Sequence, residues 1–143
     1  MDNTNVTIAR PRLEGYLYLL HDGMTGLSKI GCTKTAGSRQ KAIMGAHSNV
    51  LVNVLNAKVA DYRAAETQCH RHFQAFRTNG EWFSAPLQSI IEYMHGQVDW
   101  LELDFESPGR VMNYLVFCRL GDMRRAKEVL SRKGTSAAQL LAA

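Results

Sequence analysis

The chain has 143 residues, of which 45% are hydrophobic and 21% charged, a composition typical of one globular domain with a single core. This length excludes a second full-sized domain. The net charge of +4 is unevenly spread, because residues 1–106 hold 10 Lys and Arg against 11 Asp and Glu, whereas residues 107–143 hold 7 against 2. A basic C-terminal segment suits a phosphate backbone or acidic surface as partner, and equally a solvated helix face, so both interpretations stay open.

The cysteines and the apolar pattern indicate a compartment. Cys32, Cys69 and Cys118 are odd in number and form no CxxC pair, which favours free thiols in a reducing environment. Residues 1–8 are polar, and no run of about 18 apolar residues occurs, so neither a signal peptide nor a membrane-spanning helix is expected. We therefore expect a cytoplasmic protein without a membrane partner.

The first predicted element is a β-hairpin. Residues 15–21 (GYLYLLH) and 27–33 (LSKIGCT) are apolar, strand-like runs separated by a glycine-containing turn cluster. If the loop spans residues 22–25, Tyr18 lies directly opposite Lys29, and opposed residues of an antiparallel pair share one face of the sheet. The hairpin therefore predicts that these two side chains lie together.

The remaining elements alternate along the chain and predict an α+β fold of order β-β-α-β-α-β with a C-terminal helical extension. The expected division is a compact domain over residues 12–90 and an accessory strand or linker with a basic helical tail over residues 91–143. Within the compact domain, the patterns predict a helix over 37–47 with Ser38 as N-cap, a strand over 50–59, a helix over 61–77 stopped by residues 78–80, and an edge strand over 80–83. A helix is expected over 87–98, and residues 100–105 form either a strand or an extended linker. Two helices are expected within 110–133, and they meet near Gly121.

The helix predicted over 61–77 carries two stripes of side chains. Ala65, Cys69, His72 and Phe76 fall on one side, and Glu66 and His70 fall on the other. No second pair of metal ligands follows this segment, so we interpret His72 as a core histidine and predict no zinc site here.

An ordered set of motifs resembles a known nuclease family. Tyr18, the Lys29-Ile30-Gly31 triplet, Arg39, Glu66 and the NGEWF stretch over 79–83 are similar to a GIY-YIG nuclease domain of the phage T5 orf-type subgroup, in which KIG and a GEWF ending are usual. The resemblance covers about residues 15 to 86. It implies a small α+β fold, a metal-dependent phosphodiesterase activity and a bacterial or phage-infected host cell as the location.

The resemblance also implies roles for individual residues. Glu66 occupies the place of the carboxylate that binds one divalent ion, Mg²⁺ or Mn²⁺, an ion that prefers oxygen ligands. Tyr18 occupies the place of the tyrosine that helps to deprotonate the attacking water. Lys29 and Arg39 would lower the pKa of this phenol, which is ordinarily about 10. Arg39 occupies the place of the arginine that holds the scissile phosphate.

Three further residues belong to the predicted site. Lys29 stands where the second tyrosine of the family name usually stands, and as a charged ammonium it is a poor general base. Asn79 matches an asparagine that contacts the active site, although a helix C-cap or turn role fits it equally. His70, one helical turn after Glu66, is a secondary catalytic candidate. Glu81 and Trp82 are expected to serve the fold, with stacking on a base as an alternative for Trp82.

Three functions are consistent with this sequence. The first is a divalent-metal-dependent endonuclease acting on DNA. The second is a catalytically silent GIY-YIG-like module that binds nucleic acid or a protein, and the third is a structural subunit that assembles as a homodimer or with a partner through its C-terminal helices. The residues expected to contact nucleic acid are Lys34, Arg110, Arg124, Arg125, Lys127, Arg132 and Lys133.

Overall fold

The structure is a computed structural model, and it describes residues 13–131. Within this part of the chain, six strands form one antiparallel sheet in the order β4-β5-β2-β1-β3-β6, which confirms the predicted α+β class. The strands are β1 (Gly15–Asp22), β2 (Leu27–Thr33), β3 (Leu51–Val59), β4 (Arg77–Asn79), β5 (Trp82–Phe83) and β6 (Trp100–Phe105). The helices are α1 (Ser38–Ala46), α2 (Tyr62–His72), the short 3₁₀ helix η2 (Gln74–Phe76), α3 (Leu87–Gly96), α4 (Pro108–Arg119) and α5 (Met123–Ser131).

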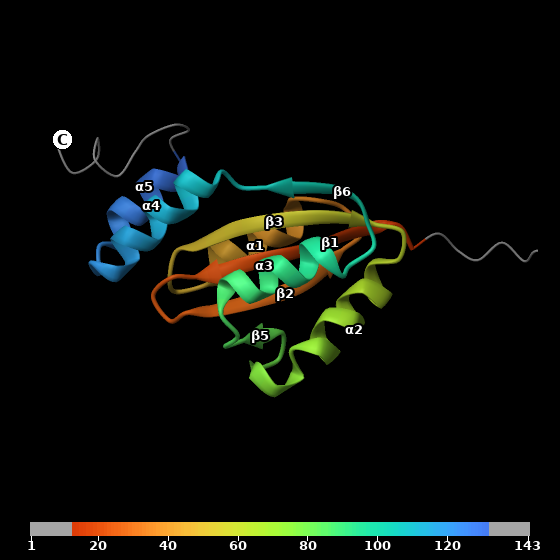
Figure 1. The fold of residues 1–143 in the computed structure, drawn as a ribbon. Coiled ribbons are helices and arrows are strands. Elements are labelled where there is room, and N and C mark those ends of the chain that lie inside the picture. Colours follow the sequence, from red (N-terminus) through yellow and green to blue (C-terminus); the bar gives the residue numbers. More distant parts are fainter. Residues whose placement is uncertain (1–12, 132–143) are drawn as a thin grey trace, which may run out of the picture.

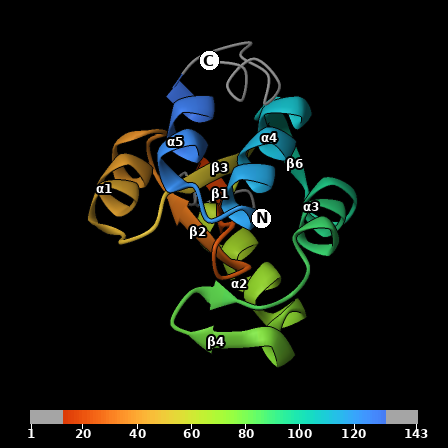
Figure 2. The same cartoon turned by 90° about the vertical axis from the view of Figure 1, so that its left-hand side faces the viewer.

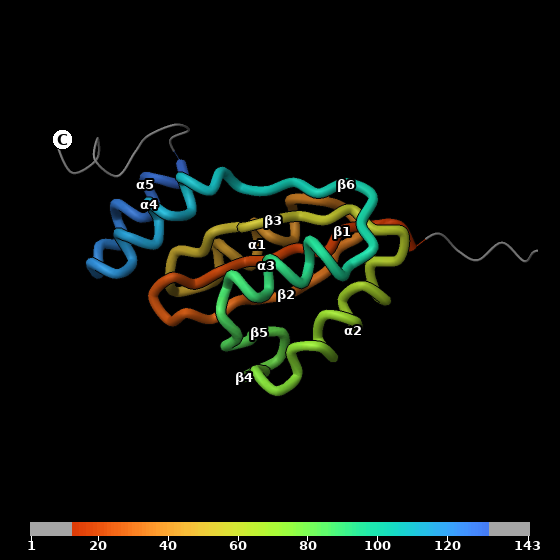
Figure 3. Tube along the Cα trace, in the orientation of Figure 1, coloured from red at the N-terminus to blue at the C-terminus, as the bar shows by residue number. Residues whose placement is uncertain are grey.

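The helices cover both faces of the sheet and one of its ends. Helices α1 and α3 lie on opposite faces, while α2 runs along the β2 side of the sheet, and α4 and α5 pack together at the other end (Figures 1 and 2). The trace in Figure 3 shows the long strands β1, β2 and β3 as the centre of this arrangement. Strand β1 is paired on both edges, and because helices cover both faces of the sheet, all its side chains except Tyr16 are buried.

The two faces of the sheet bury two separate apolar clusters. The larger cluster lies between the sheet and helices α2, α3 and α4. The smaller one lies under α1 and joins Tyr18, Leu20 and Leu51 to Ile43 and Met44 of the helix. Burial of these side chains is the main force that holds the helices against the sheet. Tyr18 thus belongs to the core under α1.

The hairpin is confirmed, but its predicted register is wrong by two residues. Tyr18 lies opposite Gly31, and Lys29 lies opposite Leu20. The turn begins one residue later than expected because the Asp22 side chain accepts hydrogen bonds from the backbone N–H groups of Met24 and Thr25, at 2.9 and 3.2 Å. A shift of two residues keeps every side chain on its predicted face, since side chains alternate with a period of two.

Helix α2 ends five residues earlier than expected, at His72. Phe73 turns into the core and is 4% exposed, whereas His72 is exposed and stacks on Tyr93 with ring centroids 3.9 Å apart. The prediction of a core histidine at position 72 is therefore wrong. The chain leaves the helix at Phe73 through η2 so that residues 77–79 can pair as β4 with β5.

The predicted edge strand and C-terminal elements are observed with one change. Strand β5 is not the edge of the sheet, because the unforeseen strand β4 lies outside it. Strand β6 resolves the choice between strand and linker at 100–105, since it pairs with β3. Helices α4 and α5 meet at Gly121, whose φ of 74° suits glycine, as expected. No helix in residues 13–131 is long and apolar enough to cross a membrane.

Helix α4 is anchored to the end of the hairpin by a buried tyrosine. The Tyr114 hydroxyl accepts the backbone N–H of Gly23 at 2.8 Å and lies 2.5 Å from the Val50 carbonyl oxygen, to which it donates. A β-carbon at Gly23 would meet the Cys118 sulfur at 2.7 Å, so the helix packs directly against the turn backbone. The helical extension is therefore tied to the sheet.

Candidate active site

The predicted catalytic residues other than Asn79 converge where the outer edge of β2 loses its strand partner. Strand β5 pairs with β2 only at Ser28 and Lys29. Beyond Lys29, no strand of the described residues pairs with this edge of β2. Helix α1 lies on one side of the open edge and α2 on the other (Figure 2). Side chains from both helices and both strands can therefore reach the same place.

Tyr18 and Arg39 form the first pair in this site. The Arg39 Nε–H group donates a long hydrogen bond of 3.4 Å to the Tyr18 hydroxyl. The Tyr18 ring lies across Gly31, because a β-carbon at position 31 would collide with its hydroxyl and Cζ atoms. This packing explains why glycine follows Lys29-Ile30, and it fixes the phenol where it holds the guanidinium.

Burial governs the acidity of Tyr18. Loss of solvent raises the pKa of the Tyr18 hydroxyl above its ordinary value of 10.0, and the hydrogen bond and charge of Arg39 only partly oppose this shift. Arg39 thus lowers the pKa of Tyr18 as expected, but by less than burial raises it, and Lys29 does not contribute to the shift. Lys29 is engaged elsewhere, because its Nζ lies 3.0 Å from Glu81 Oε1.

Glu66 and Glu81 form the second pair. Burial raises the pKa of the Glu66 carboxyl, and the nearby carboxylate of Glu81 raises it further, while His70 opposes both effects. The two carboxyl groups are close enough to share a hydrogen bond. The Cys32 thiol borders them, and burial together with the negative charge of Glu66 raises its pKa to about 12. Cys32 is thus a neutral thiol beside Glu66.

This carboxylate pair fits a divalent cation. Glu81 Oε1 is buried and accepts no aligned hydrogen bond, although Lys29 Nζ lies within ion-pair distance. Two close carboxylates repel each other when both are charged, and a hard cation with oxygen ligands would relieve that repulsion. No cluster of three or more His, Cys, Asp or Glu residues suited to a metal occurs in residues 13–131. The donor set is therefore the Glu66 and Glu81 pair, open to solvent and substrate oxygens.

His70 is directed to the backbone of β2. Its Nε2 atom lies 2.7 Å from the Ile30 carbonyl oxygen, so Nε2–H donates to it, and Arg77 Nη2 lies 3.4 Å from Nδ1. Both ring nitrogens therefore have protein partners, and His70 ties α2 to the open edge of β2. Asn79 lies in β4 opposite Trp82, exposed, and its side chain makes none of the hydrogen bonds found among the described residues.

The residues predicted to contact nucleic acid lie mostly away from this edge. Lys34 is exposed in the loop between β2 and α1, which borders the site. Three arginines of the C-terminal helices are engaged in ion pairs within 4.0 Å of a carboxylate, Arg110 with Glu106, Arg124 with Glu128 and Arg125 with Asp122. Lys127 is exposed on α5. Arg132 and Lys133 lie outside the described residues.

A comparison with known protein families identifies the family of this chain. A family model described as the T5orf172 domain matches residues 15–98, more than half of the chain. The chain belongs to the T5orf172 domain family. The match extends from β1 to the end of α3 and so contains every residue of the candidate active site. No curated protein and no solved structure gives a significant match to the chain.

The match confirms the T5 orf-type part of the resemblance and extends it beyond residue 86, while the assignment to GIY-YIG nucleases stays a prediction. Sequence reasoning found Tyr18, Lys29, Arg39 and Glu66, which the structure brings together, but it assigned Glu81 to the fold. The signal that could have identified Glu81 is its place in the GEWF ending. In the structure, Glu81 and Trp82 are half-buried and Phe83 is buried.

Proposed function

We propose that this T5orf172 domain is a divalent-metal-dependent endonuclease of the GIY-YIG type, which hydrolyses phosphodiester bonds of DNA. One observation carries the proposal. A pair of half-buried carboxylates, Glu66 and Glu81, lies at the same open strand edge as a guanidinium, Arg39, that is held by a buried phenol. Carboxylates for a hard cation and a planar donor for phosphate are the two requirements of metal-assisted phosphodiester hydrolysis.

In this proposal Glu66 and Glu81 hold the cation. A bound Mg²⁺ or Mn²⁺ supplies Lewis-acid chemistry, in that it polarises a phosphoryl oxygen and makes an attacking water more acidic. Lys29 neutralises Glu81 at 3.0 Å and holds that carboxylate toward Glu66. The charge of Lys29 therefore lets two carboxylates stay close before the cation binds.

Arg39 binds the scissile phosphate through its two terminal nitrogens, since Nε is already directed to Tyr18. Fixed donors of this kind stabilise the charge that grows on the phosphoryl oxygens during attack. Tyr18 is a neutral phenol at pH 7 because burial raises its pKa. Its oxygen accepts from the Arg39 Nε–H group at the surface of the core, and Tyr18 itself is buried. We assign Tyr18 the orientation of Arg39.

The alternative of a catalytically silent nucleic-acid-binding module is favoured by one observation. Lys29, which replaces the family's second tyrosine, is tied to Glu81, and no group at this edge is a strong base in the arrangement described. Partner binding through the C-terminal helices would use the apolar side chains that α4 exposes, namely Met112, Val116 and Leu120. The mass of the protein in solution shows whether two copies associate through these side chains.

Nicking of supercoiled plasmid DNA separates the two functions. The endonuclease proposal expects nicking that requires Mg²⁺ or Mn²⁺, stops with a chelator, and is abolished by Glu66→Gln. A matched control is Glu92→Gln, an exposed glutamate on α3. Binding of DNA without metal-dependent nicking by the wild type would support the silent module and overturn the endonuclease.

A thermal-shift titration with metal tests the site independently of catalysis. Because a ligand that binds only the folded state raises its stability, Mg²⁺ or Mn²⁺ should raise the melting temperature of the wild type and of Glu92→Gln. The rise should be absent in Glu66→Gln and reduced in Glu81→Gln. Equal shifts in all four proteins would remove Glu66 and Glu81 as the ligands.

A further inference from the structure

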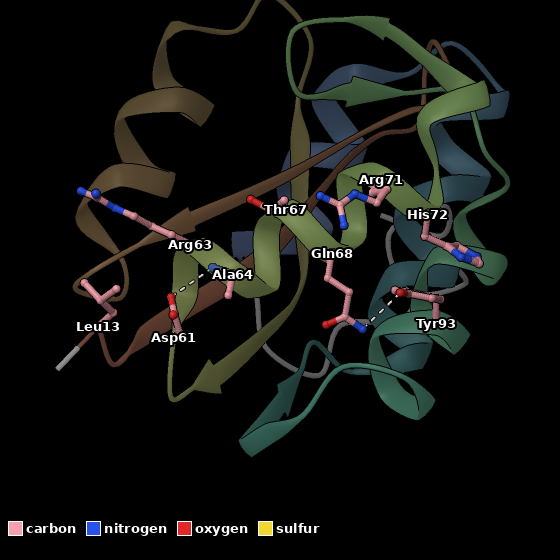
Figure 4. Close-up of a pocket in the computed structure, with 9 residues that line it drawn as sticks. All are labelled: Leu13, Asp61, Arg63, Ala64, Thr67, Gln68, Arg71, His72 and Tyr93. Carbon is pink, nitrogen blue, oxygen red and sulfur yellow. Dashed lines mark hydrogen bonds between the residues drawn. The ribbon is translucent and has the colours of Figure 1, made fainter. Parts of the chain in front are cut away.

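The outer face of α2 carries exposed arginines beside the candidate active site. Arg63 and Arg71 lie two helical turns apart, about 12 Å along the helix axis, with Thr67 between them. All three are exposed and line a groove of about 700 Å³ that runs along α2 (Figure 4). We call Arg63, Thr67 and Arg71 the α2 track. Sequence analysis placed nucleic-acid contacts elsewhere, chiefly on the C-terminal helices.

The α2 track adjoins the carboxylate pair. Residues three and four apart are neighbours on a helix surface, so Arg63 lies next to Glu66, and Thr67 lies next to both His70 and Arg71. Figure 4 shows the Arg63 side chain extending toward α1, which carries Arg39 on the other side of the open β2 edge. A strand bound at Arg39 can therefore continue onto the α2 track.

The charge of the α2 track is not neutralised within the described structure. The ion pairs of residues 13–131 include neither Arg63 nor Arg71, in contrast to Arg110, Arg124 and Arg125 on the C-terminal helices. Asp61 is the one carboxylate that lines the groove, and it is occupied as the N-cap that accepts from Ala64 N–H at 3.0 Å. Within residues 13–131, the groove therefore presents guanidiniums that form no ion pair.

Helix stability does not explain the position of Arg63. It lies in the first turn of α2, where the helix dipole disfavours a positive charge, and this turn contains no acidic residue. Its guanidinium carbon lies 5.7 Å from the centroid of the Tyr62 ring. Arg39 occupies the equivalent first-turn position of α1. Both arginines that flank the open edge are thus placed where an anion, but not the helix, gains from them.

From this arrangement we infer that the α2 track binds the phosphate backbone of the DNA substrate next to the scissile phosphate. The inference rests on the proposed function for the location of the scissile phosphate. It assigns duplex DNA as the partner and the sugar-phosphate backbone as the recognised chemistry, because exposed guanidiniums and a threonine hydroxyl contact phosphates without reading bases. Binding at the α2 track is consequently independent of sequence and sensitive to salt.

Equilibrium binding of a fluorescent DNA duplex, measured by anisotropy with a chelator present, tests the inference without cleavage. Each phosphate contact contributes about 0.9 to the slope of log affinity against log salt, which corresponds to about eightfold in affinity near 0.1 M salt. Arg63→Gln and Arg71→Gln should each weaken binding by about this factor and lower the slope by about 0.9. The double variant should lose about 60-fold and behave alike on duplexes of unrelated sequence.

Arg119→Gln is the matched control, because Arg119 is an exposed arginine on α4, at the other end of the sheet from α2. It should retain both affinity and slope. Wild-type affinity and slope in the Arg63 and Arg71 variants, or an equal loss in Arg119→Gln, would overturn the inference. Preference of the α2 track for a single-stranded or RNA probe over the duplex would also overturn it.

The outcomes separate this inference from the endonuclease proposal. DNA binding that depends on the α2 track in a chain that never nicks plasmid would contradict the endonuclease and leave the track in place. Metal-dependent nicking by the wild type, together with unchanged DNA binding by the Arg63 and Arg71 variants, would support the endonuclease and contradict the role of the α2 track. Circular dichroism of each variant shows that the fold is retained, as expected for exposed side chains without ion pairs.

Discussion

The contact between Tyr18 and Gly31 predicts a large effect of one methyl group. In Gly31→Ala the new β-carbon would lie 2.7 Å from Tyr18 Cε1 and nearer still to its Cζ and hydroxyl oxygen. The Tyr18 ring has no exposed surface and cannot swing into solvent. Overpacking of this kind destabilises by about 1–3 kcal/mol. We expect a value of about 2 kcal/mol, which lowers the melting temperature by about 8 °C for a chain of this size.

Urea denaturation of Gly31→Ala measures this loss directly, with Gly45→Ala as the matched control. Gly45 lies on α1, and a β-carbon there would have no neighbour within 4 Å. The control should gain up to about 1 kcal/mol, because alanine favours helix over glycine. Displacement of the Tyr18 ring should also loosen Arg39, so plasmid nicking by Gly31→Ala should fall by more than its loss of folded protein explains.

A second background decides whether the tyrosine is the cause. In Tyr18→Val the ring is gone, so the additional Gly31→Ala change should destabilise by less than about 0.5 kcal/mol. The reasoning is refuted if Gly31→Ala is as stable as the wild type, or if its effect is the same with and without the Tyr18 ring.

The remaining predictions concern the charged groups. Burial and Glu81 raise the pKa of Glu66 above its ordinary value of 4.5, so the folded state binds the proton of this carboxyl more tightly than the unfolded state. The folded state therefore loses stability as the pH rises from 4.5 through the raised pKa. Glu66→Gln should therefore raise the free energy of unfolding at pH 7 without metal, with a gain that disappears below pH 4.5; a less stable variant at pH 7 would contradict this. The pKa of Asp22 is shifted in the opposite direction. Burial raises it, but the hydrogen bonds of the carboxylate, including one of 2.9 Å with His47, outweigh burial and lower the pKa from its ordinary value of 3.8. Asp22→Asn should destabilise by about 1–3 kcal/mol at pH 7 in urea denaturation, with a difference that narrows as pH falls below 3.8. Arg39→Lys should slow plasmid nicking by about 100-fold, since an ammonium lacks the planar fork of donors, and an unchanged rate would remove Arg39 from the phosphate site.

The fold was predictable where local patterns are strong. Glycine-rich turns and apolar runs define the β1–β2 hairpin, and the strand predicted over 50–59 is observed as β3. The register of the hairpin was not predictable, because a shift of two residues leaves the alternation unchanged. The Asp22 side chain, through its bonds to the turn backbone, decides it.

The end of α2 and the place of Glu81 depend on tertiary structure. Nothing in the local sequence around Phe73 stops a helix, and the helix ends there because the next residues pair as a hairpin, β4 with β5. That hairpin turns at Gly80, whose φ is 59°, and sets Glu81 beside Glu66, 15 positions earlier in the chain. Sequence reasoning could name Glu66 from its motif, but it could not see that a second carboxylate returns to it.

The rate at which the purified wild type nicks supercoiled plasmid, followed against Mg²⁺ concentration beside Glu66→Gln and Glu92→Gln, tests the central claim most directly. The account predicts a rate that rises with Mg²⁺ and saturates for the wild type and Glu92→Gln, and no nicking above the protein-free plasmid for Glu66→Gln. Equal nicking by Glu66→Gln and the wild type, or nicking by the wild type that persists in a chelator, would contradict it.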